Sequence, residues 1–514
     1  MEAILPNALL TAEQMQLVDQ NAASQGICTF SLMQRAGLAV ADGVRSLARA
    51  PCKVLVLAGP GNNGGDGAIA AVELLADGYD VELISIGGAL VEGSDAFRAH
   101  QLWQQHIADT TSSCAARVSD NFIMSIESAS VVVDAMFGAG LSRPLSSISE
   151  QLVNLVNASS AKVVAVDVPS GLNGNTHCIN GPCIQAHLTV TFFLRKPAHV
   201  LFPGRQLCGQ VLLTQIGLSS EHLNREGPQC WLNESILFRD KLPEIDVSGH
   251  KFDRGHVLVR SGPIQSTGAA RLSAVTALFS GAGLVTVATT SDALATNAAH
   301  LTAVMLQRVD THEEWVEALS DQRINTVVVG PGNGVNEETR QCVIASLAAN
   351  KQCVLDADAL SCWQEPDQNS MLMRSLNTCL QTTVITPHAG EFKRLFGDFS
   401  SEQFPSKLHQ TREAARLANS VVVYKGADTV VAAPDGRASI NANAPPWLAT
   451  AGAGDVLAGA IAALLAQGAP TFEAVCAAVW LHGAAASKLG YPLCAEDLVR
   501  QVGRELGHMN TINL

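Results

Sequence analysis

Short apolar runs alternate with helix-like segments through the first 225 residues. Between the apolar runs lie segments with helical spacing, for example 68–76, 96–105 and 148–156. Short, wholly apolar runs are typical of strands buried on both faces of a parallel sheet. The pattern therefore predicts a doubly wound α/β sheet. Its expected strands are Val54–Ala58, Val81–Ile86, Val131–Asp134, Val163–Asp167, Leu188–Phe193 and Val211–Leu213. A helix at Thr11–Ala22, opened by a Thr11-x-x-Gln14 capping box, is expected to precede the sheet.

A second α/β series follows a polar stretch near Gly217–Lys241, which Gly227-Pro228 interrupts. We place the domain boundary in this stretch, giving domains 1–225 and 226–514. The motifs of the two series differ, so they are not duplicates. The strands expected in the second series are His256–Arg260, Leu284–Ala288, Thr326–Val329, Val354–Asp356, Val384–Thr386 and Val421–Tyr424, with a hairpin at Thr429–Ala433 and Ala438–Asn441. Its main helices are expected at Thr267–Gly281, Gly454–Ala466, Glu473–Leu489 and Glu496–Leu506.

Composition narrows the classes of protein. A chain of 514 residues favours two or three domains, and its net charge of −14 argues against nucleic acid as a main partner. The longest apolar stretches, such as Val456–Ala466, are too short to span a membrane. No Lys or Arg precedes Arg35, which argues against a signal peptide and favours a cytoplasmic location. The thirteen cysteines are scattered without a C-x-x-C pair, so we expect reduced, mostly buried thiols, with Cys353 in the core.

A glycine-dense stretch, Gly59–Gly67, directly follows the first apolar run. Glycines allow the backbone to approach an anion, and the start of the following helix supplies free N–H groups. A tight strand-to-helix turn is the simpler alternative, but Asn62, Asn63 and Asp66 are more polar than such a turn requires. The stretch predicts a binding loop.

Two further strand ends in this half carry polar groups, in Asp134–Pro144 and Asp167–Gly171. A single Asp at the end of a strand is usually a helix cap. Three polar loops after parallel strands meet at one sheet edge, where open α/β sheets bind ligands. We therefore expect a shared site.

In the second half, Thr450–Asp455 runs into an apolar helix. Glycines at a helix N-terminus form an anion-binding site, and Asp455 there is either a capping residue or a base. Three other strand ends support a nucleotide site: Lys425–Thr429, Gly330–Gly334 and Thr386–Glu391.

Residues 10–220 resemble the N-terminal domain of the bifunctional NAD(P)H-hydrate repair enzymes, the YjeF family. The motifs N-N-G-G-D-G, D-x-x-F-G-x-G-L-x-R and D-x-P-S-G occur intact and in order. The resemblance implies a Rossmann-like domain that epimerises the (R) and (S) hydrates of NADH and NADPH. Asp167 would be the general acid/base, Asn63, Asp134 and Ser170 would bind K⁺, and Lys196 is a weaker candidate, more simply a surface lysine. The hydrate would contact Asn62, Asn63, Gly64, Gly65, Asp66, Gly138, Ala139, Gly140, Leu141, Ser142, Arg143, Pro144 and Asp167.

Residues 240–510 resemble the ribokinase-like dehydratase domain of the same family, through G-A-G-D, T-P-H-x-G-E and Lys425–Thr429. The resemblance implies dehydration of the (S) hydrate at the expense of a nucleoside phosphate, with Mg²⁺ assisting. The sequence leaves the choice between ADP and ATP open; ADP is the expectation for a fused enzyme of this family, with AMP and phosphate released. Asp455 would be the base. Ala270, Gly334, His388 and Asp455 would contact the hydrate, and Lys425, Gly426, Ala427, Asp428, Thr429 and Gly454 would bind the nucleotide. Arg260 departs from the family pattern and leaves the packing at the end of its strand open.

Two other functions remain open at this point. G-A-G-D alone fits a ribokinase-like small-molecule kinase, whereas domains like the first half also occur as binding modules in RNA-decapping scaffolds. The expected partners are the hydrates NADHX and NADPHX and ADP, without nucleic acid or membrane, and a homo-oligomer is expected.

Overall fold

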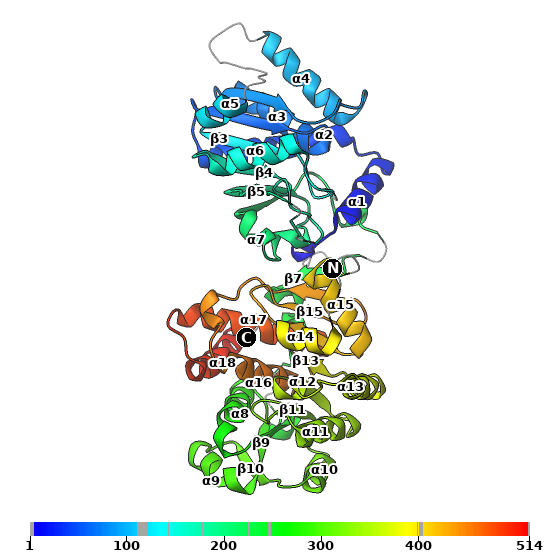
Figure 1. Cartoon of the computed structure of the whole chain (residues 1–514), viewed down its shortest axis with the longest axis vertical. Coiled ribbons are helices and arrows are strands. Elements are labelled where there is room, and N and C mark those ends of the chain that lie inside the picture. Colours follow the sequence, from blue (N-terminus) through cyan, green and yellow to red (C-terminus); the bar gives the residue numbers. More distant parts are fainter. Residues whose placement is uncertain are drawn as a thin grey trace. The chain divides into compact units, whose positions relative to one another are not determined.

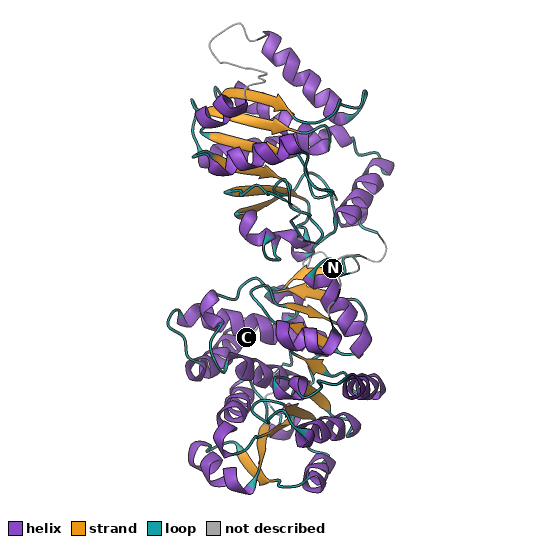
Figure 2. Ribbon diagram, viewed as in Figure 1, coloured by secondary structure: helices purple, strands orange, loops and turns teal. Residues whose placement is uncertain are grey.

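Two separate sheets organise the chain (Figures 1 and 2). The structure, a computed structural model, describes residues 5–109, 122–141, 143–176, 178–179, 181–224, 227–244, 248–397, 399 and 404–511. The chain divides into two units, Met1–Gln229 and Cys230–Leu514, and each unit contains an α/β fold.

The six strands of the first unit are all parallel, in the order β2-β1-β3-β4-β5-β6. The strand order reverses between β1 and β3, so the loops that follow these two strands lie at a switch point, where such sheets bind ligands. The strand bounds are β1 (Lys53–Ala58), β2 (Asp80–Ser85), β3 (Val131–Ala135), β4 (Lys162–Val166), β5 (Leu188–Phe192) and β6 (Gln210–Thr214). The doubly wound fold and the expected last strand are confirmed.

Helices cover both faces of this sheet. Contacts with the strands place α2 and α3 on one face, while α5 and α6 close the other over an apolar cluster that includes Leu57, Val132 and Val163. The capping box at Thr11 is confirmed. The helix bounds are α1 (Ala12–Ser24), α2 (Thr29–Leu47), α3 (Asn62–Ala76), α4 (Asp95–Asp109), α5 (Phe122–Ser128), α6 (Ser147–Ala158) and α7 (Gly204–Leu207).

The start of α3 corrects one prediction. The helix begins at Asn62 and not at Ala68, so most of the glycine-dense stretch forms its first turns. Gly61 is the N-cap and offers no side-chain acceptor. The first N–H groups of α3 therefore lack a side-chain cap, which suits binding of an anion.

The second unit contains a ten-strand sheet in the order β10-β9-β8-β11-β12-β13-β14-β15-β16-β7. Pairing is parallel except along the predicted hairpin, which β15 and β16 form, and between β14 and β15. The order reverses between β8 and β11. β7 lies in the polar stretch near Gly217–Lys241, and its pairing with β16 was not predicted. The bounds are β7 (Cys230–Leu232), β8 (His256–Arg260), β9 (Leu284–Thr289), β10 (Met305–Arg308), β11 (Thr326–Val329), β12 (Gln352–Leu355), β13 (Val384–Ile385), β14 (Val421–Tyr424), β15 (Val430–Ala432) and β16 (Ala438–Ile440).

The main core of the second unit lies beneath α8, α16, α17 and α18, where α16 is almost wholly buried. Helices α10, α11, α13 and α15 pack side by side as a separate group. The helix bounds are α8 (Thr267–Phe279), α9 (Ser291–His300), α10 (His312–Ser320), α11 (Glu337–Ala348), α12 (Asp358–Ser361), α13 (Pro366–Thr378), α14 (Ala389–Phe396), α15 (Lys407–Ala418), α16 (Ala453–Ala466), α17 (Thr471–Leu489) and α18 (Ala495–Thr511).

The cysteines agree with the prediction wherever the structure describes them. All of the described cysteines are free thiols, most are buried, and Cys353 is fully enclosed in the core. Among the described residues, no helix combines the length and apolar character that crossing a membrane requires.

Close packing of α8 on α16 gives a test of this core. A methyl group at Gly459 would overlap the carbonyl oxygen of Ser273, so Gly459→Ala should lower the free energy of unfolding by about 1–3 kcal/mol. Heat inactivation of the second unit's activity measures the change. Gly507→Ala on α18 is the matched control, because nothing lies within 4 Å of the added methyl group. Equal effects of the two substitutions would contradict the close contact.

Candidate active sites

Asp167 and Lys196 form a buried ion pair at the carboxyl edge of the first sheet. Lys196 Nζ lies 2.5 Å from Asp167 Oδ1, and Thr191 Oγ1 donates to the same oxygen at 2.9 Å. The expectation of a surface lysine is wrong: Lys196 is 3% exposed. Burial opposes ionisation of Asp167, but the charge and hydrogen bond of Lys196 outweigh it and lower the pKa of Asp167. Asp167 is therefore a carboxylate at neutral pH.

His199 supports this pair from the short helix Pro197–His199. Its Nδ1 accepts from the Lys196 N–H at 3.0 Å, which leaves Nε2 to donate to the Asp167 carbonyl oxygen at 2.8 Å. Burial, reinforced by the charge of Lys196, lowers the pKa of His199 to about 4, so the ring stays neutral. The hydrogen bond helps to hold Asp167 at a φ of 64°, a conformation rare for residues other than glycine. Sequence reasoning missed His199.

Two more carboxyl groups face this pair. Asp66, one turn into α3, is 8% exposed, and its pKa is raised well above the usual value by burial and then by the charges of Asp167 and Asp19. Asp19 on α1, which sequence reasoning also missed, has a pKa raised to about 6, mainly by burial. Asp167 and Asp19 thus share the charge of Lys196.

The predicted K⁺ ligands lie at neighbouring strand ends. Ser170 donates to Asp134 from its N–H at 2.7 Å and from Oγ at 2.6 Å. Asp134 is fully buried, and no cationic side chain within the described residues pairs with it. Burial raises its pKa to about 6 despite these hydrogen bonds. Asn63 Nδ2 is buried without a partner. A carboxylate lacking a counter-ion beside amide and hydroxyl groups fits a cation that prefers oxygen ligands.

The other described residues predicted to contact the hydrate follow β1 and β3. Gly138 lies between two site groups, because a methyl group there would be 3.1 Å from Asn63 Oδ1 and 3.7 Å from Asp167 Oδ2. The Ala139 N–H donates to Asp167 Oδ2 at 3.3 Å. Arg143 is exposed and borders a small hollow with Asn173. Ser142 lies outside the described residues. Asn62, Gly64 and Gly65 lie in the first turns of α3, and Gly140, Leu141 and Pro144 lie in the loop after β3.

In the second unit, Asp356 links three elements. It follows β12, and its Oδ1 accepts from Lys425 Nζ at 2.7 Å and from Thr386 Oγ1 at 2.6 Å. It is 2% exposed. Sequence reasoning used Asp356 only as the end of a strand, although a carboxylate after an apolar run was the signal that identified Asp134 and Asp167. The pair joins the predicted Lys425 loop to the centre of the sheet.

Gly454 and Asp455 lie in the first turn of α16, beside this pair. A methyl group on Gly454 would lie 3.5 Å from Asp356 Oδ2 and 3.6 Å from Lys425 Nζ, so the N-terminus of α16 meets both groups. Burial, the charge of Asp356 and that of Asp358 raise the pKa of Asp455 to about 7, although Lys425 acts in the opposite direction. A carboxyl group with this pKa accepts a proton readily near neutral pH.

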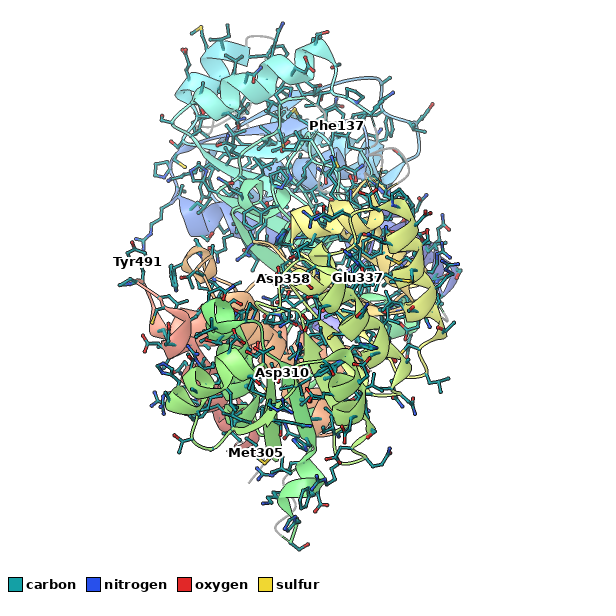
Figure 3. The ribbon with its side chains drawn as sticks, turned by 60° about the horizontal axis from the view of Figure 1, so that its bottom comes forward. Phe137, Met305, Asp310, Glu337, Asp358 and Tyr491 are labelled. Carbon is teal, nitrogen blue, oxygen red and sulfur yellow. The ribbon has the colours of Figure 1, made fainter. Side chains whose placement is uncertain are left out.

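The loops after β8, β11 and β12 complete this edge. Gly334 N–H donates to Asp358 Oδ2 at 2.8 Å, and Ser266 Oγ donates to the Gly332 carbonyl at 2.7 Å. Asp358 begins α12 and is labelled in Figure 3. Ala270 is fully buried on α8 within the core, so its contact with a hydrate stays a prediction.

His388 caps α14 and leaves its ring exposed. Nδ1 accepts from the N–H groups of Gly390 and Glu391, while Glu391 Oε2 accepts from the His388 N–H at 2.9 Å. The motif T-P-H-x-G-E thus forms a reciprocal cap that presents an imidazole to solvent at the sheet edge.

The predicted nucleotide loop is held by a lysine that was not predicted. Lys407 Nζ lies 2.7 Å from Asp428 Oδ1 and 4.6 Å from the Tyr424 ring centroid. Thr429 Oγ1 donates to the Gly426 carbonyl at 3.0 Å. The loop is therefore closed by its own contacts, while Gly426 and Ala427 are exposed.

Arg260 occupies a defined place. Its guanidinium donates to Val309 O at 3.1 Å, lies 2.5 Å from Glu338 Oε1 and stands over the Trp315 ring. A cation is tolerated at this strand end because these partners satisfy it.

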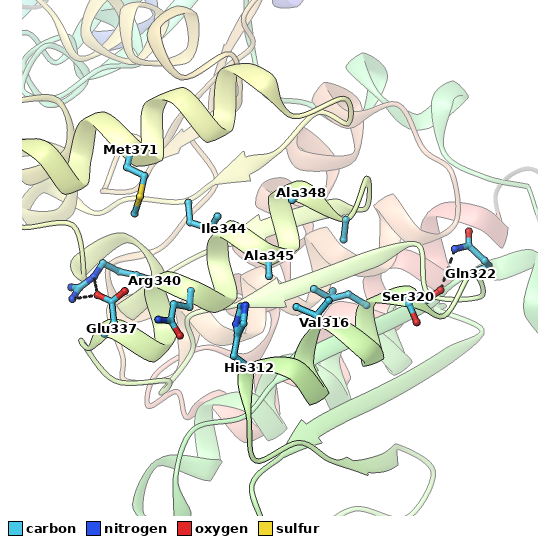
Figure 4. A pocket seen from close by; sticks show the side chains of 13 residues that line it. His312, Val316, Ser320, Gln322, Glu337, Arg340, Ile344, Ala345, Ala348 and Met371 are labelled. Atoms are coloured by element: carbon cyan, nitrogen blue, oxygen red, sulfur yellow. Dashed lines mark hydrogen bonds and ion pairs between the residues drawn. The ribbon is translucent and has the colours of Figure 1, made fainter.

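A groove of about 610 Å³ lies over α10, α11 and α13 (Figure 4). Its lining includes Val316, Ile344 and Met371 and none of the predicted site residues. This groove is therefore separate from the predicted site residues.

Comparisons with known proteins cover both units. A family model described as "YjeF-related protein N-terminus" matches residues 29–198, and one described as "NAD(P)H-hydrate dehydratase" matches residues 257–495. A bifunctional NAD(P)H-hydrate repair enzyme of Thermofilum pendens is 34% identical over 92% of this chain and 90% of the relative. The chain belongs to the bifunctional NAD(P)H-hydrate repair enzymes. Its two units are the epimerase and dehydratase domains of that family.

A second relative agrees with this membership. The bifunctional NAD(P)H-hydrate repair enzyme of Escherichia coli is 33% identical over 94% of this chain and 90% of the relative. Among solved structures, the ADP/ATP-dependent NAD(P)H-hydrate dehydratase of Bacillus subtilis, co-crystallised with ATP and Mg²⁺, is 28% identical. The match spans 54% of this chain and 98% of that protein, with a TM-score of 0.47. Both family models and both repair-enzyme relatives favour NAD(P)H-hydrate repair over the small-molecule kinase and RNA-scaffold alternatives.

The low pKa of His199 predicts a contribution to the stability of the epimerase unit that is lost in acid. Below the ordinary pKa of 6.5 the unfolded chain binds a proton that the folded unit does not. The contribution of His199 to stability should therefore fall by about 3 kcal/mol between pH 6.5 and 4, whereas Asp19 and Asp134, whose pKa values are raised to about 6, contribute in the opposite direction. His199→Gln retains a donor and an acceptor, and should remove this dependence. Urea unfolding with pulse proteolysis at pH 5 and pH 7.5 measures the change in stability, and His106→Gln, at an exposed histidine, is the control. Unchanged acid sensitivity in His199→Gln would contradict the assignment.

Proposed function

We propose that this chain epimerises the (R) and (S) hydrates of NADH and NADPH in its first unit and dehydrates the (S) hydrate with ADP in its second. The observation that carries the dehydratase assignment is the meeting of Asp455 and Gly454 with the Asp356–Lys425 pair. A base, free N–H groups and a lysine at one helix N-terminus suit phosphoryl transfer to a hydroxyl.

In the proposed reaction Asp455 accepts the hydroxyl proton of the (S) hydrate while that oxygen attacks the β-phosphorus of ADP. The bond to the α-phosphate breaks and AMP leaves. The phosphorylated hydrate then expels phosphate and loses a proton from the adjacent carbon, which restores the ring double bond of NAD(P)H. Lys425, Gly426, Ala427, Asp428, Thr429 and Gly454 bind the nucleotide, and Ala270, Gly334 and His388 contact the hydrate.

Mg²⁺ would neutralise phosphate charge in this unit. No cluster of three His, Cys, Asp or Glu that could hold a metal occurs among the described residues, which suits an ion bound mainly through nucleotide phosphates. In the first unit, Asp167 is the proposed acid/base, and Asn63, Asp134 and Ser170 hold K⁺. A cytoplasmic location and a homo-oligomeric state complete the proposal.

One assay tests both activities. Absorbance of reduced nicotinamide is followed from mixed (R,S) NADH hydrate with ADP, with ATP or with neither. Full recovery is expected only with a nucleotide, and faster with ADP. Asp455→Ala should abolish recovery yet leave epimerisation, and Asp167→Ala should restrict rapid recovery to the (S) fraction. Loss of both activities in either folded variant would contradict two independent sites.

The proposed K⁺ site predicts dependence on the monovalent ion. Epimerisation should fall at least about tenfold when K⁺ is replaced by Li⁺, because the smaller ion fits a wide oxygen site poorly. Ser170→Ala should lose this dependence and much of the activity. Dehydration of pure (S) hydrate is the internal control. Equal epimerisation rates in K⁺ and in Li⁺ would overturn the site.

A further inference from the structure

Asp66 is a buried carboxyl group without a partner among the residues that the structure describes. It lies three residues after Asn63 and four after Asn62, so all three side chains share one face of α3. It is 8% exposed, and no hydrogen bond or ion pair joins its carboxyl to any described residue. A buried carboxyl group without a partner destabilises the fold, so its presence in the protein needs an explanation.

The groups around Asp66 come from three other elements. Asp19 faces it from α1, and Asp167 from the end of β4. Lys196, which follows β5, pairs with Asp167. The neutral ring of His199 hydrogen-bonds to the backbone of both residues. Asp66 therefore faces two carboxyl groups while the ammonium is engaged by one of them.

Hydrogen bonds fix the orientation of both carboxylate oxygens of Asp167. Oδ1 accepts from Lys196 and Thr191, while Oδ2 accepts from the Ala139 N–H. Because Gly138 has no side chain, Asn63 Oδ1 and Asp167 Oδ2 border space that a methyl group would occupy. Asp66 lies on the same helix face as Asn63, so the two acidic groups approach this space from different elements.

We propose that Asp66 is the general acid of hydrate epimerisation and acts opposite Asp167 as the base. The inference rests on the proposed role of Asp167. Two carboxyl groups in contrasting environments divide acid and base work in several enzymes.

The electrostatics agree with this division. Burial and the charges of Asp167 and Asp19 raise the pKa of Asp66, so it retains a proton at neutral pH. Lys196 outweighs burial at Asp167 and lowers its pKa, so it is ready to accept one.

The chemistry balances without a further reactant. Addition of water to the enamine of a dihydronicotinamide places the hydroxyl on the ring carbon beside nitrogen. Asp66 gives its proton to that hydroxyl, the carbon–oxygen bond breaks, and the nitrogen lone pair forms a carbon–nitrogen double bond. Water then adds to the opposite face as Asp167 removes its proton. The proton returns from Asp167 to Asp66 through solvent, and the reverse reaction uses the same steps.

Asp66→Asn tests the proposal because the amide keeps the size but cannot give up a proton. Epimerisation should fall at least about 100-fold, whereas dehydration of pure (S) hydrate should not change. Asp66→Glu should recover part of the loss. Asp19→Asn is the matched control: it removes a neighbouring carboxyl and should reduce the rate less than about tenfold.

Isotope exchange gives a second measurement. In H₂¹⁸O, the wild-type enzyme should incorporate one labelled oxygen for each inversion, and Asp66→Asn should lose labelling and inversion together. If Asp66→Asn does not fold, Asp66→Ala with added formate decides: formate-dependent epimerisation supports the proposal. Inversion without labelling, or an Asp66→Asn rate within about threefold of wild type, would overturn it. A wild-type chain that does not epimerise would instead refute the proposed function.

Discussion

Contact between backbones at each switch point is the constraint on which both sites depend. A methyl group on Gly59 would overlap the carbonyl of Met136, and one on Gly262 would overlap that of Gly332. These pairs join the loops after β1 and β3 and those after β8 and β11, where the strand order reverses. Any side chain would separate the loops. Strand ends from both halves of each sheet can therefore meet at one ligand.

The two sites share an electrostatic arrangement built on unrelated motifs. In each, a lysine after one strand pairs with a carboxylate after another: Lys196 with Asp167, and Lys425 with Asp356. A second carboxyl at a helix N-terminal turn lies near the pair, and its pKa is raised. The pKa of Asp455 is about 7, and the pKa of Asp66 is raised as well. A charged pair beside a carboxyl group of raised pKa suits reactions that move a proton at a single hydroxyl.

Strand-end motifs carried most of what was predictable about the sites. Apolar runs predicted the central strands because strands buried on both faces have no polar positions. The apolar pattern predicted an element less well where that element depends on contacts with distant parts of the chain. Helix α2 was missed although ten of its residues are buried, and β7 lies in a polar stretch and forms only by pairing with β16. Lys196 was undervalued because a lysine after a strand is usually exposed.

By itself the sequence determined the two α/β units, the glycine-bearing loops and the family, since these depend on local residue type and spacing. Only the tertiary structure decided which polar groups meet. The pairing of Lys425 with Asp356, 69 residues apart, follows from the order of strands in the sheet. The raised pKa values of Asp66 and Asp455 likewise depend on burial and on charges contributed by other elements. Neither burial nor distant charge is encoded in the residues beside them.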